Sequence, residues 1–149
     1  PLEYPLPLLD KRYSEYPKGQ APPVLEKLAG VLREADAYIL VTAEYNYGPP
    51  PALKNIIDHF TEEHSEKVAG IVSYSTGDFG GVRAAELWRI MLHNLNMVVT
   101  PHTMVIPRLQ DVFAEDGALK DQKYLERTAK FLDELEWWVE AAKAKREKR

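Results

Sequence analysis

The stretch AYILVTAEYNYGPPPALKN, residues 37–55, holds the local pattern that decides the fold. Its first part, AYILVT, is a short continuous apolar run, which is typical of a strand covered on both faces. Its last part begins a segment from Pro51 to Phe60 in which apolar residues recur at spacings of three and four, the pattern of a helix. We therefore predict a strand, then a polar and aromatic loop, then a short helix.

The same alternation continues along the rest of the chain. Proline suits the first turn of a helix, because its missing N–H has no partner there, and Pro22 and Pro23 precede such a segment. Apolar strands that alternate with helices indicate parallel strands joined by crossover connections. We predict an α/β fold, a three-layer sandwich around a parallel sheet, with residues 1–149 as a single domain. The predicted elements are a helix over 24–35 with Val31 inward, a strand over 37–42, a helix over 51–60, a strand over 68–74, a helix over 81–96 with Leu87 inward, a strand over 97–106 interrupted by Pro101, and a long helix from about 121 to the end.

Composition excludes several classes of protein. Apolar content of 45% and charged content of 28% are ordinary for a soluble globular domain. The net charge of −4 argues against nucleic acid or an anionic membrane as the main partner, because no overall field attracts phosphate groups. The chain has no cysteine, which removes disulfides, thiolate catalysis and cysteine zinc sites. No apolar stretch is long enough to cross a bilayer, and we expect a cytoplasmic protein.

Two polar loops follow neighbouring predicted strands. The first is Ala43 to Pro50, and the second is Ser75 to Gly81, which is rich in glycine. Ligands of open α/β sheets bind outside the carboxyl ends of the strands, where both loops are expected to lie side by side. Glycine lets backbone approach a ligand closely, and the helix that begins near Val82 directs free N–H groups toward the second loop. The polar and aromatic side chains of the first loop, with the glycines and free N–H groups of the second, suit a flat heterocycle with polar edges better than a metal or a sugar.

Three segments resemble a known family. TAEYNYGPPPALKNIID, from residue 42, resembles the T-P-E-Y-N-x-G-x-P-x-x-L-K-N-x-x-D signature of the NADPH-dependent FMN reductase family, whose fold is flavodoxin-like. STGDFGGVRA, from residue 75, resembles the glycine-rich loop of that family, and YPLPLLD, from residue 4, is similar to the segment after its second strand. The resemblance implies that both loops hold the flavin ring.

The resemblance also assigns roles to individual residues. One group lines a side of the isoalloxazine: Ala43, Glu44, Tyr45 and Asn46. A second group contacts its pyrimidine edge: Ser75, Thr76, Gly77, Gly80 and Gly81. Ala43 stands where the family usually has proline. Valine at Gly80 or Gly81 is expected to weaken flavin binding and to leave folding little affected.

The expected activity follows from the same family. The resemblance implies an NAD(P)H-dependent flavin oxidoreductase that passes a hydride from NAD(P)H through FMN to a flavin, quinone, azo or other small acceptor. The flavin performs the chemistry, and no protein acid or base is assigned. A homodimer or homotetramer is expected, with Leu53 to Phe60 at the interface. Two alternatives stay open: a flavodoxin-like electron carrier without enzyme activity, and an interaction subunit that has lost the cofactor.

The chain departs from the family at its start. Nothing in it resembles the G-S-x-R-x-x-S phosphate loop after the family's first strand. In the flavodoxin order 2-1-3-4-5, residues 37–42 correspond to the third strand, whose neighbour is the first. We expect an N-terminally incomplete domain in which the edge from Tyr38 to Val41 pairs with an upstream segment or another chain, because bare apolar edges promote aggregation. We also expect this chain alone to bind FMN more weakly than the native protein.

Two further patterns are interpreted without function. The four histidines, His59, His64, His93 and His102, lack the i, i+4 pairing of a helical metal site and are expected at the surface or in the core. The terminal run KAKREKR could bind nucleic acid. Cations also suit the end of a helix, so we interpret the run as a frayed, solvated tail.

Overall fold

The structure, a computed structural model, describes residues 5–148 and confirms the predicted alternation of strands and helices. Its sheet has three parallel strands in the order β1-β2-β3. The elements are η1 (Tyr13–Glu15), α1 (Pro23–Glu34), β1 (Ala37–Thr42), α2 (Pro51–Asp58), η2 (Glu62–His64), β2 (Val68–Tyr74), α3 (Val82–Asn94), β3 (Val98–Ile106), α4 (Leu109–Val112) and α5 (Lys123–Arg146).

The register of the sheet is regular except at one place. β1 pairs with β2 from Ala37 opposite Val68 to Thr42 opposite Ser73. Ala69 pairs with Val99 and Ile71 with Thr103, so β3 bulges over residues 100–102. Pro101 lies in this bulge, and β3 is an edge strand, which is where a residue without an N–H is tolerated in a sheet. The interruption predicted at Pro101 is therefore confirmed.

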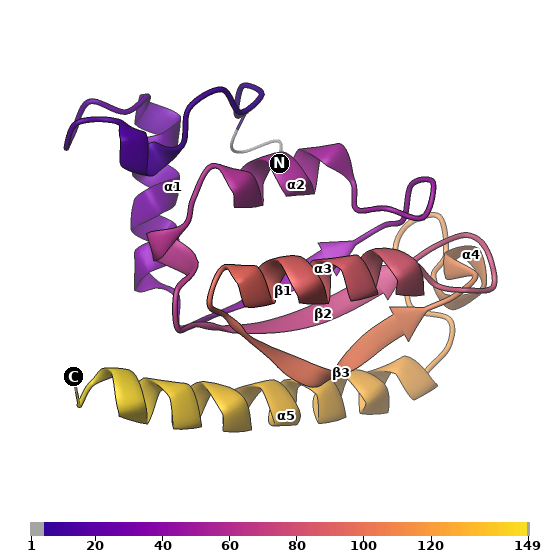
Figure 1. Ribbon diagram of the computed structural model, residues 1–149. Helices are drawn as coiled ribbons and strands as arrows, with labels where there is room; N and C mark the ends of the chain where they lie inside the picture. The colour runs from indigo at the N-terminus through magenta and orange to yellow at the C-terminus, as the bar shows by residue number, and fades with distance from the viewer. Residues whose placement is uncertain (1–4, 149) are drawn as a thin grey trace.

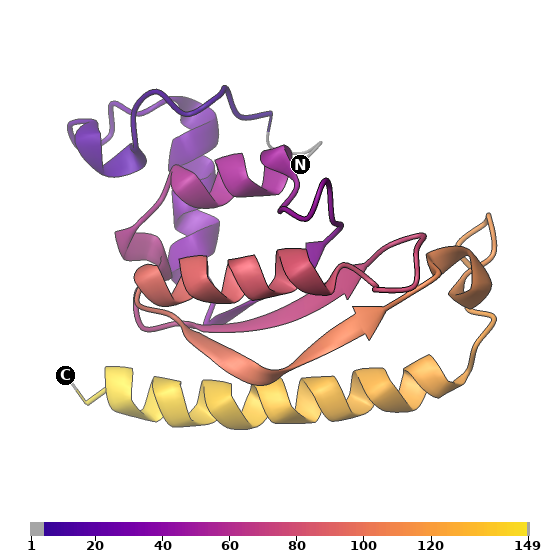
Figure 2. The ribbon, with the colours of Figure 1, turned by 45° about the vertical axis from the view of Figure 1, so that its right-hand side comes forward.

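Helices cover both faces of the sheet, as Figures 1 and 2 show. On one face, Trp88 of α3 and Ile57 of α2 pack with Leu40 and Ile71 of the strands. On the other face, Phe131 of α5 packs so closely that a Cβ on Gly70 of β2 would lie 2.6 Å from its ring. The three-layer sandwich predicted from the sequence is confirmed.

The inward faces of two helices differ from prediction at one residue each. Val31 and Leu87 are exposed, while Ala29 and Leu92 are buried instead. In α3 the buried stripe runs through Trp88 and Leu92, four residues apart. Leu87 precedes Trp88 by one residue and is therefore rotated by about 100° from the stripe. The helical spacing and most of each inward face are confirmed, and one residue at the border of each face was placed wrongly.

The prediction that β1 is covered on both faces is wrong for the described residues. Leu40 and Thr42 are buried beneath the helices, but Ile39 is 44% exposed and Val41 is 59% exposed. The cause is that α5 packs against β2 and β3 and does not extend over β1. The outer edge of β1 has no strand partner among residues 5–148. Its pairing with an upstream segment or another chain stays a prediction.

The C-terminal basic run is ordered through Arg146, so its interpretation as a frayed tail is wrong there. Lys143 Nζ and Arg146 Nη2 contact the Asp36 carboxylate at 2.7 and 2.6 Å. Arg146 also donates to the backbone oxygen of Glu66. The hydrogen bond from Lys143 holds the pKa of Asp36 below its ordinary value. Contacts across the molecule, which no local pattern shows, thus anchor the end of α5.

Candidate functional site at the carboxyl edge of the sheet

The two polar loops lie side by side, beyond the ends of β1 and β2 (Figures 1 and 2). The Oε2 atom of Glu44 in the first loop accepts hydrogen bonds from the backbone N–H groups of Arg83 and Ala84, at 3.0 and 3.1 Å. These two residues belong to the first turn of α3, directly after the second loop. The prediction that the two loops lie side by side at the carboxyl ends of the strands is therefore confirmed.

The first loop is a tight turn that presents its side chains outward. Tyr45 and Gly48 exchange backbone hydrogen bonds of 2.9 and 2.8 Å. Between them, Asn46 and Tyr47 have φ values of 47° and 66°, the left-handed region that two-residue hairpin turns of type I′ require. Asparagine is well suited to that region, but tyrosine adopts it less readily. Tyr45 and Tyr47 are each 63% exposed, and Asn46 is exposed beside them.

The two glycines at the end of the second loop pack against the protein itself. Gly80 and Gly81 are buried, with φ values of 60° and 76°. A Cβ on Gly80 would lie 2.4 Å from Val105 Cγ1, and one on Gly81 would lie 2.9 Å from the Tyr74 oxygen. We expected valine there to leave folding little affected because the loop lies outside the core, and these contacts contradict that expectation.

The middle of the second loop offers free donors. Within residues 5–148, the backbone N–H groups of residues 76–79 have no hydrogen-bond partner. Ser75 is different, because its N–H donates to the Ile106 oxygen and its hydroxyl donates to the Gly77 oxygen. The side chain of Ser75 is thus used inside the loop. Among the residues predicted to contact the pyrimidine edge of the flavin, Thr76 and Gly77 keep backbone N–H groups that are free to donate to a ligand.

A cation that sequence reasoning missed joins the loops. The guanidinium carbon of Arg83 lies 4.3 Å from the ring centre of Tyr47 and 4.5 Å from that of Phe79, so each loop contributes one ring. Arg83 Nη1 is also 3.6 Å from Glu44 Oε1. A signal existed in the sequence, because an arginine in the first turn of a helix opposes the helix dipole unless an anion lies nearby.

The start of α3 therefore differs from prediction. We expected its free N–H groups to point at a ligand. Instead, the Glu44 carboxylate takes the N–H groups of Arg83 and Ala84 and places a negative charge at the positive end of the helix. Glu44 contacts the protein rather than lying open in the loop. The donors that remain for a ligand belong to residues 76–79.

The groups left open fit a flavin ring. An isoalloxazine has flat apolar faces and a pyrimidine edge with carbonyl oxygens that accept hydrogen bonds. The loops supply the exposed rings of Tyr45, Tyr47 and Phe79 and the unpaired N–H groups of residues 76–79. Among the described residues, no group of three or more His, Cys, Asp or Glu side chains is arranged to hold a metal ion.

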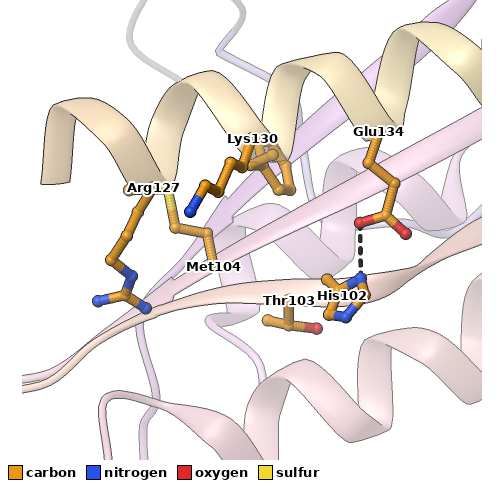
Figure 3. A pocket seen from close by; sticks show the side chains of 7 residues that line it. His102, Thr103, Met104, Arg127, Lys130 and Glu134 are labelled. Carbon is orange, nitrogen blue, oxygen red and sulfur yellow. Dashed lines mark hydrogen bonds and ion pairs between the residues drawn. The ribbon is translucent and has the colours of Figure 1, made fainter.

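A separate hollow of about 490 Å³ lies between β3 and α5 (Figure 3). Met104 and Phe131 are the apolar side chains of its lining, and Figure 3 shows Arg127 and Lys130 projecting from α5 beside Met104. His102 Nδ1 and Glu134 Oε2 are 2.8 Å apart on the other side. No residue of either polar loop lines this hollow. It lies along the middle of an edge strand, so it is not the site predicted from the strand ends.

Comparisons with known proteins give a consistent result. A sequence model described as NADPH-dependent FMN reductase matches residues 2–111. The chain is 36% identical over 127 residues to an NAD(P)H-dependent FMN reductase of Pseudomonas aeruginosa, covering 79% of this chain and 66% of that protein. It is 38% identical over 82 residues to a quinone reductase of Escherichia coli K12, covering 52% of this chain and 44% of that protein.

Solved structures include a similar flavoenzyme. This is the NAD(P)H:(acceptor) oxidoreductase FerB of Paracoccus denitrificans, with a TM-score of 0.72 and 25% identity, covering 85% of this chain and 75% of that one. The flavodoxin-like fold expected from the sequence is thereby confirmed. The matched part of this chain spans about two thirds of the Pseudomonas relative and less than half of the Escherichia relative.

Proposed function

Because the chain belongs to the NADPH-dependent FMN reductase family, we propose that its two loops hold the isoalloxazine ring of FMN in an NAD(P)H-dependent oxidoreductase. Bound FMN supplies the chemistry, which is acceptance of a hydride from NAD(P)H and its transfer to a small acceptor such as a flavin, a quinone or an azo compound. The observation that carries this proposal is the contact between the loops, which brings exposed rings and free N–H groups to one place.

The residues of the site divide by what they do. Tyr45 and Asn46, with Ala43 at the end of β1, form one wall of the ring site. Thr76 and Gly77 donate backbone hydrogen bonds to the polar edge of the ring, which supports the negative charge of its reduced form. A last group maintains the conformation of the two loops through contacts within the protein: Glu44, Ser75, Gly80 and Gly81.

No side chain is assigned as a proton donor or acceptor. The Glu44 carboxylate already accepts two backbone hydrogen bonds and lies beside Arg83, so it is not free to move a proton. The part of the protein is to orient the ring and to keep one face open. Tyr47 and Phe79, which both contact Arg83, make a flat aromatic border for that face. Flat substrates such as nicotinamides and quinones suit such a border.

The proposed assembly is a homodimer or homotetramer, and α2 is the proposed interface. Ile90 of the neighbouring α3 is 67% exposed, and a hollow of about 410 Å³ between the two helices includes Lys54, Met91 and Asn94 in its lining. The hollow and the exposed apolar side chain beside it support the proposal of an interface on this face. None of the helices in residues 5–148 is long and apolar enough to cross a membrane. We propose a cytoplasmic protein that binds neither membranes nor nucleic acid.

Flavin titration followed by turnover tests this function. FMN fluorescence should fall on binding to the full-length protein, and the complex should oxidise NADPH faster when a soluble benzoquinone is added. FMN binding without NADPH oxidation would indicate the electron carrier instead. Absence of binding by FMN and by riboflavin would contradict the assignment and favour an interaction subunit. Riboflavin is included because it presents the ring without a phosphate.

A further inference from the structure

Arg83 has an unusual position for a cation. It lies in the first turn of α3, where the helix dipole favours negative groups and disfavours positive ones. The side chain that relieves this conflict comes from the other loop. Glu44 Oε2 accepts the Arg83 and Ala84 N–H groups, and Oε1 lies 3.6 Å from the Arg83 guanidinium. One carboxylate thus satisfies both the helix end and the cation.

Two aromatic rings also contact the Arg83 guanidinium. The ring centre of Tyr47, in the first loop, lies 4.3 Å from the guanidinium carbon, and that of Phe79, in the second loop, lies 4.5 Å from it. A guanidinium within about 6 Å of a ring centre is attracted to the π face of the ring. The contact with Glu44 positions the guanidinium of Arg83. The two rings therefore take their separation from Arg83, and Arg83 takes its position from Glu44.

We infer that Glu44 and Arg83 form a latch, with Glu44 as a positioning residue that sets the spacing of the two loops before the flavin binds. The inference rests on the proposed function for the identity of the ligand, but the latch itself belongs to the unliganded chain. A site whose walls are already placed loses less conformational freedom on binding. Loss of the latch should therefore weaken ring binding even where the fold is retained.

Glutamine and alanine at position 44 separate the two roles of the carboxylate. In Glu44→Gln, the side-chain oxygen can take the place of Oε2 and accept both N–H bonds, but an amide group then faces Arg83. This variant keeps the helix cap and loses the ion pair. Glu44→Ala loses both. Glu86→Ala is the matched control, because Glu86 is an exposed acid one turn along α3 that contacts Arg89 instead.

Amide hydrogen exchange on the unliganded protein tests the latch directly. Exchange at Ala84 should be about tenfold faster in Glu44→Ala than in the wild type, and close to wild type in Glu44→Gln and Glu86→Ala. Equal exchange at Ala84 in the wild type and Glu44→Ala would show that the carboxylate does not cap α3. That result would overturn the inference whatever the ligand.

Riboflavin titration tests the effect on binding. The dissociation constant should rise about tenfold in Glu44→Ala and by a smaller factor in Glu44→Gln, with no change in Glu86→Ala. If the wild type binds riboflavin and Glu44→Ala binds it equally well, the carboxylate is only a helix cap and the inference fails. If the wild type itself does not bind the ring, the proposed function fails instead.

A double-mutant cycle gives a readout that a helix cap alone would not change. Tyr47→Ala and Phe79→Ala alter different loops, and their rings are coupled through Arg83. Their effects on the riboflavin dissociation constant should be non-additive with Glu44 present and additive in a Glu44→Gln background. Additive effects in both backgrounds would contradict a latch that connects the loops.

Discussion

Glu44 Oε2 lies 3.0 Å from the backbone nitrogen of Arg83, although 39 residues separate the two in sequence. This hydrogen bond joins the end of β1 to the start of α3 and passes directly between the two loops of the candidate site. The two loops are therefore held together as one structural unit. Glu44 and Gly80, which were expected to contact a ligand, contact the protein itself.

Valine at Gly80 should destabilise the fold. The added Cβ would lie 2.4 Å from Val105, and the φ of +60° at this position is strained for a residue with a side chain. We therefore expect the free energy of unfolding to fall by about 1–3 kcal/mol or more. Urea denaturation measures it. Gly77→Ala is the control, because its Cβ would have only the Ser75 hydroxyl at 4.0 Å nearby. Equal stability of Gly80→Val and the wild type would contradict the packing described for this loop.

The hydroxyl group of Thr42 should contribute to the stability of the fold. Trp88 Nε1–H donates to Thr42 Oγ1 at 3.0 Å, and both side chains are fully buried. Thr42→Val keeps the shape but leaves the indole N–H unpaired, which should cost about 1–3 kcal/mol in the free energy of unfolding. Thr42→Ser keeps the acceptor and should cost less. A valine variant as stable as the serine variant would show that the hydrogen bond contributes nothing.

His64 should make stability depend on pH. Burial lowers its pKa from the ordinary value of 6.5, despite a hydrogen bond to the Ile57 oxygen and the charge of Glu63, and Lys67 acts in the same direction as burial. Below pH 6.5 the unfolded chain takes up a proton that the folded chain resists. The stabilisation from this group is therefore complete above pH 6.5 and falls as the pH drops toward the folded pKa.

The difference between wild type and His64→Gln isolates this group from the other acids and bases. The wild type should lose more free energy of unfolding than the variant between pH 7 and pH 5, measured by denaturation at each pH. The interval brackets the ordinary histidine pKa of about 6.5. If the free energy of unfolding changed with pH by the same amount in both proteins, His64 would have the same pKa in the folded and unfolded chain.

The sequence predicted the strands, their parallel order and the two loops, because these depend on short apolar runs and on glycine and proline near their ends. It did not predict the exposure of Ile39 and Val41. A continuous apolar run suggests two covered faces, whereas cover depends on how far α5 extends over the sheet.

Within the site, the family resemblance placed Glu44 and Gly80 near a ligand but could not show what each contacts. Their partners lie in α3 and β3, and such long-range contacts leave no local periodicity. The stack of Arg83 on Tyr47 and Phe79 was missed for the same reason. The one available signal was the position of a cation at the start of a helix.

The exposed strand β1 gives a prediction about assembly. We expect the edge from Tyr38 to Val41 to pair with an upstream segment or another chain, because unpaired apolar edges associate. Val41→Lys should reduce association, measured by sedimentation at matched concentrations. Leu125→Lys, which makes the same kind of change at an exposed apolar position on α5, is the control. Identical sedimentation of the Val41→Lys variant and the wild type would show that this edge takes no part in association.

Backbone amide NMR of the full-length protein titrated with FMN shows whether both loops contact one flavin ring. Signals from Asn46 and Tyr47 and from Thr76 to Phe79 should shift together, with one dissociation constant. Signals from His102 and Glu134, which line the separate hollow, should not move. Shifts confined to one loop, or centred on that hollow, would show that the two loops do not share one flavin ring.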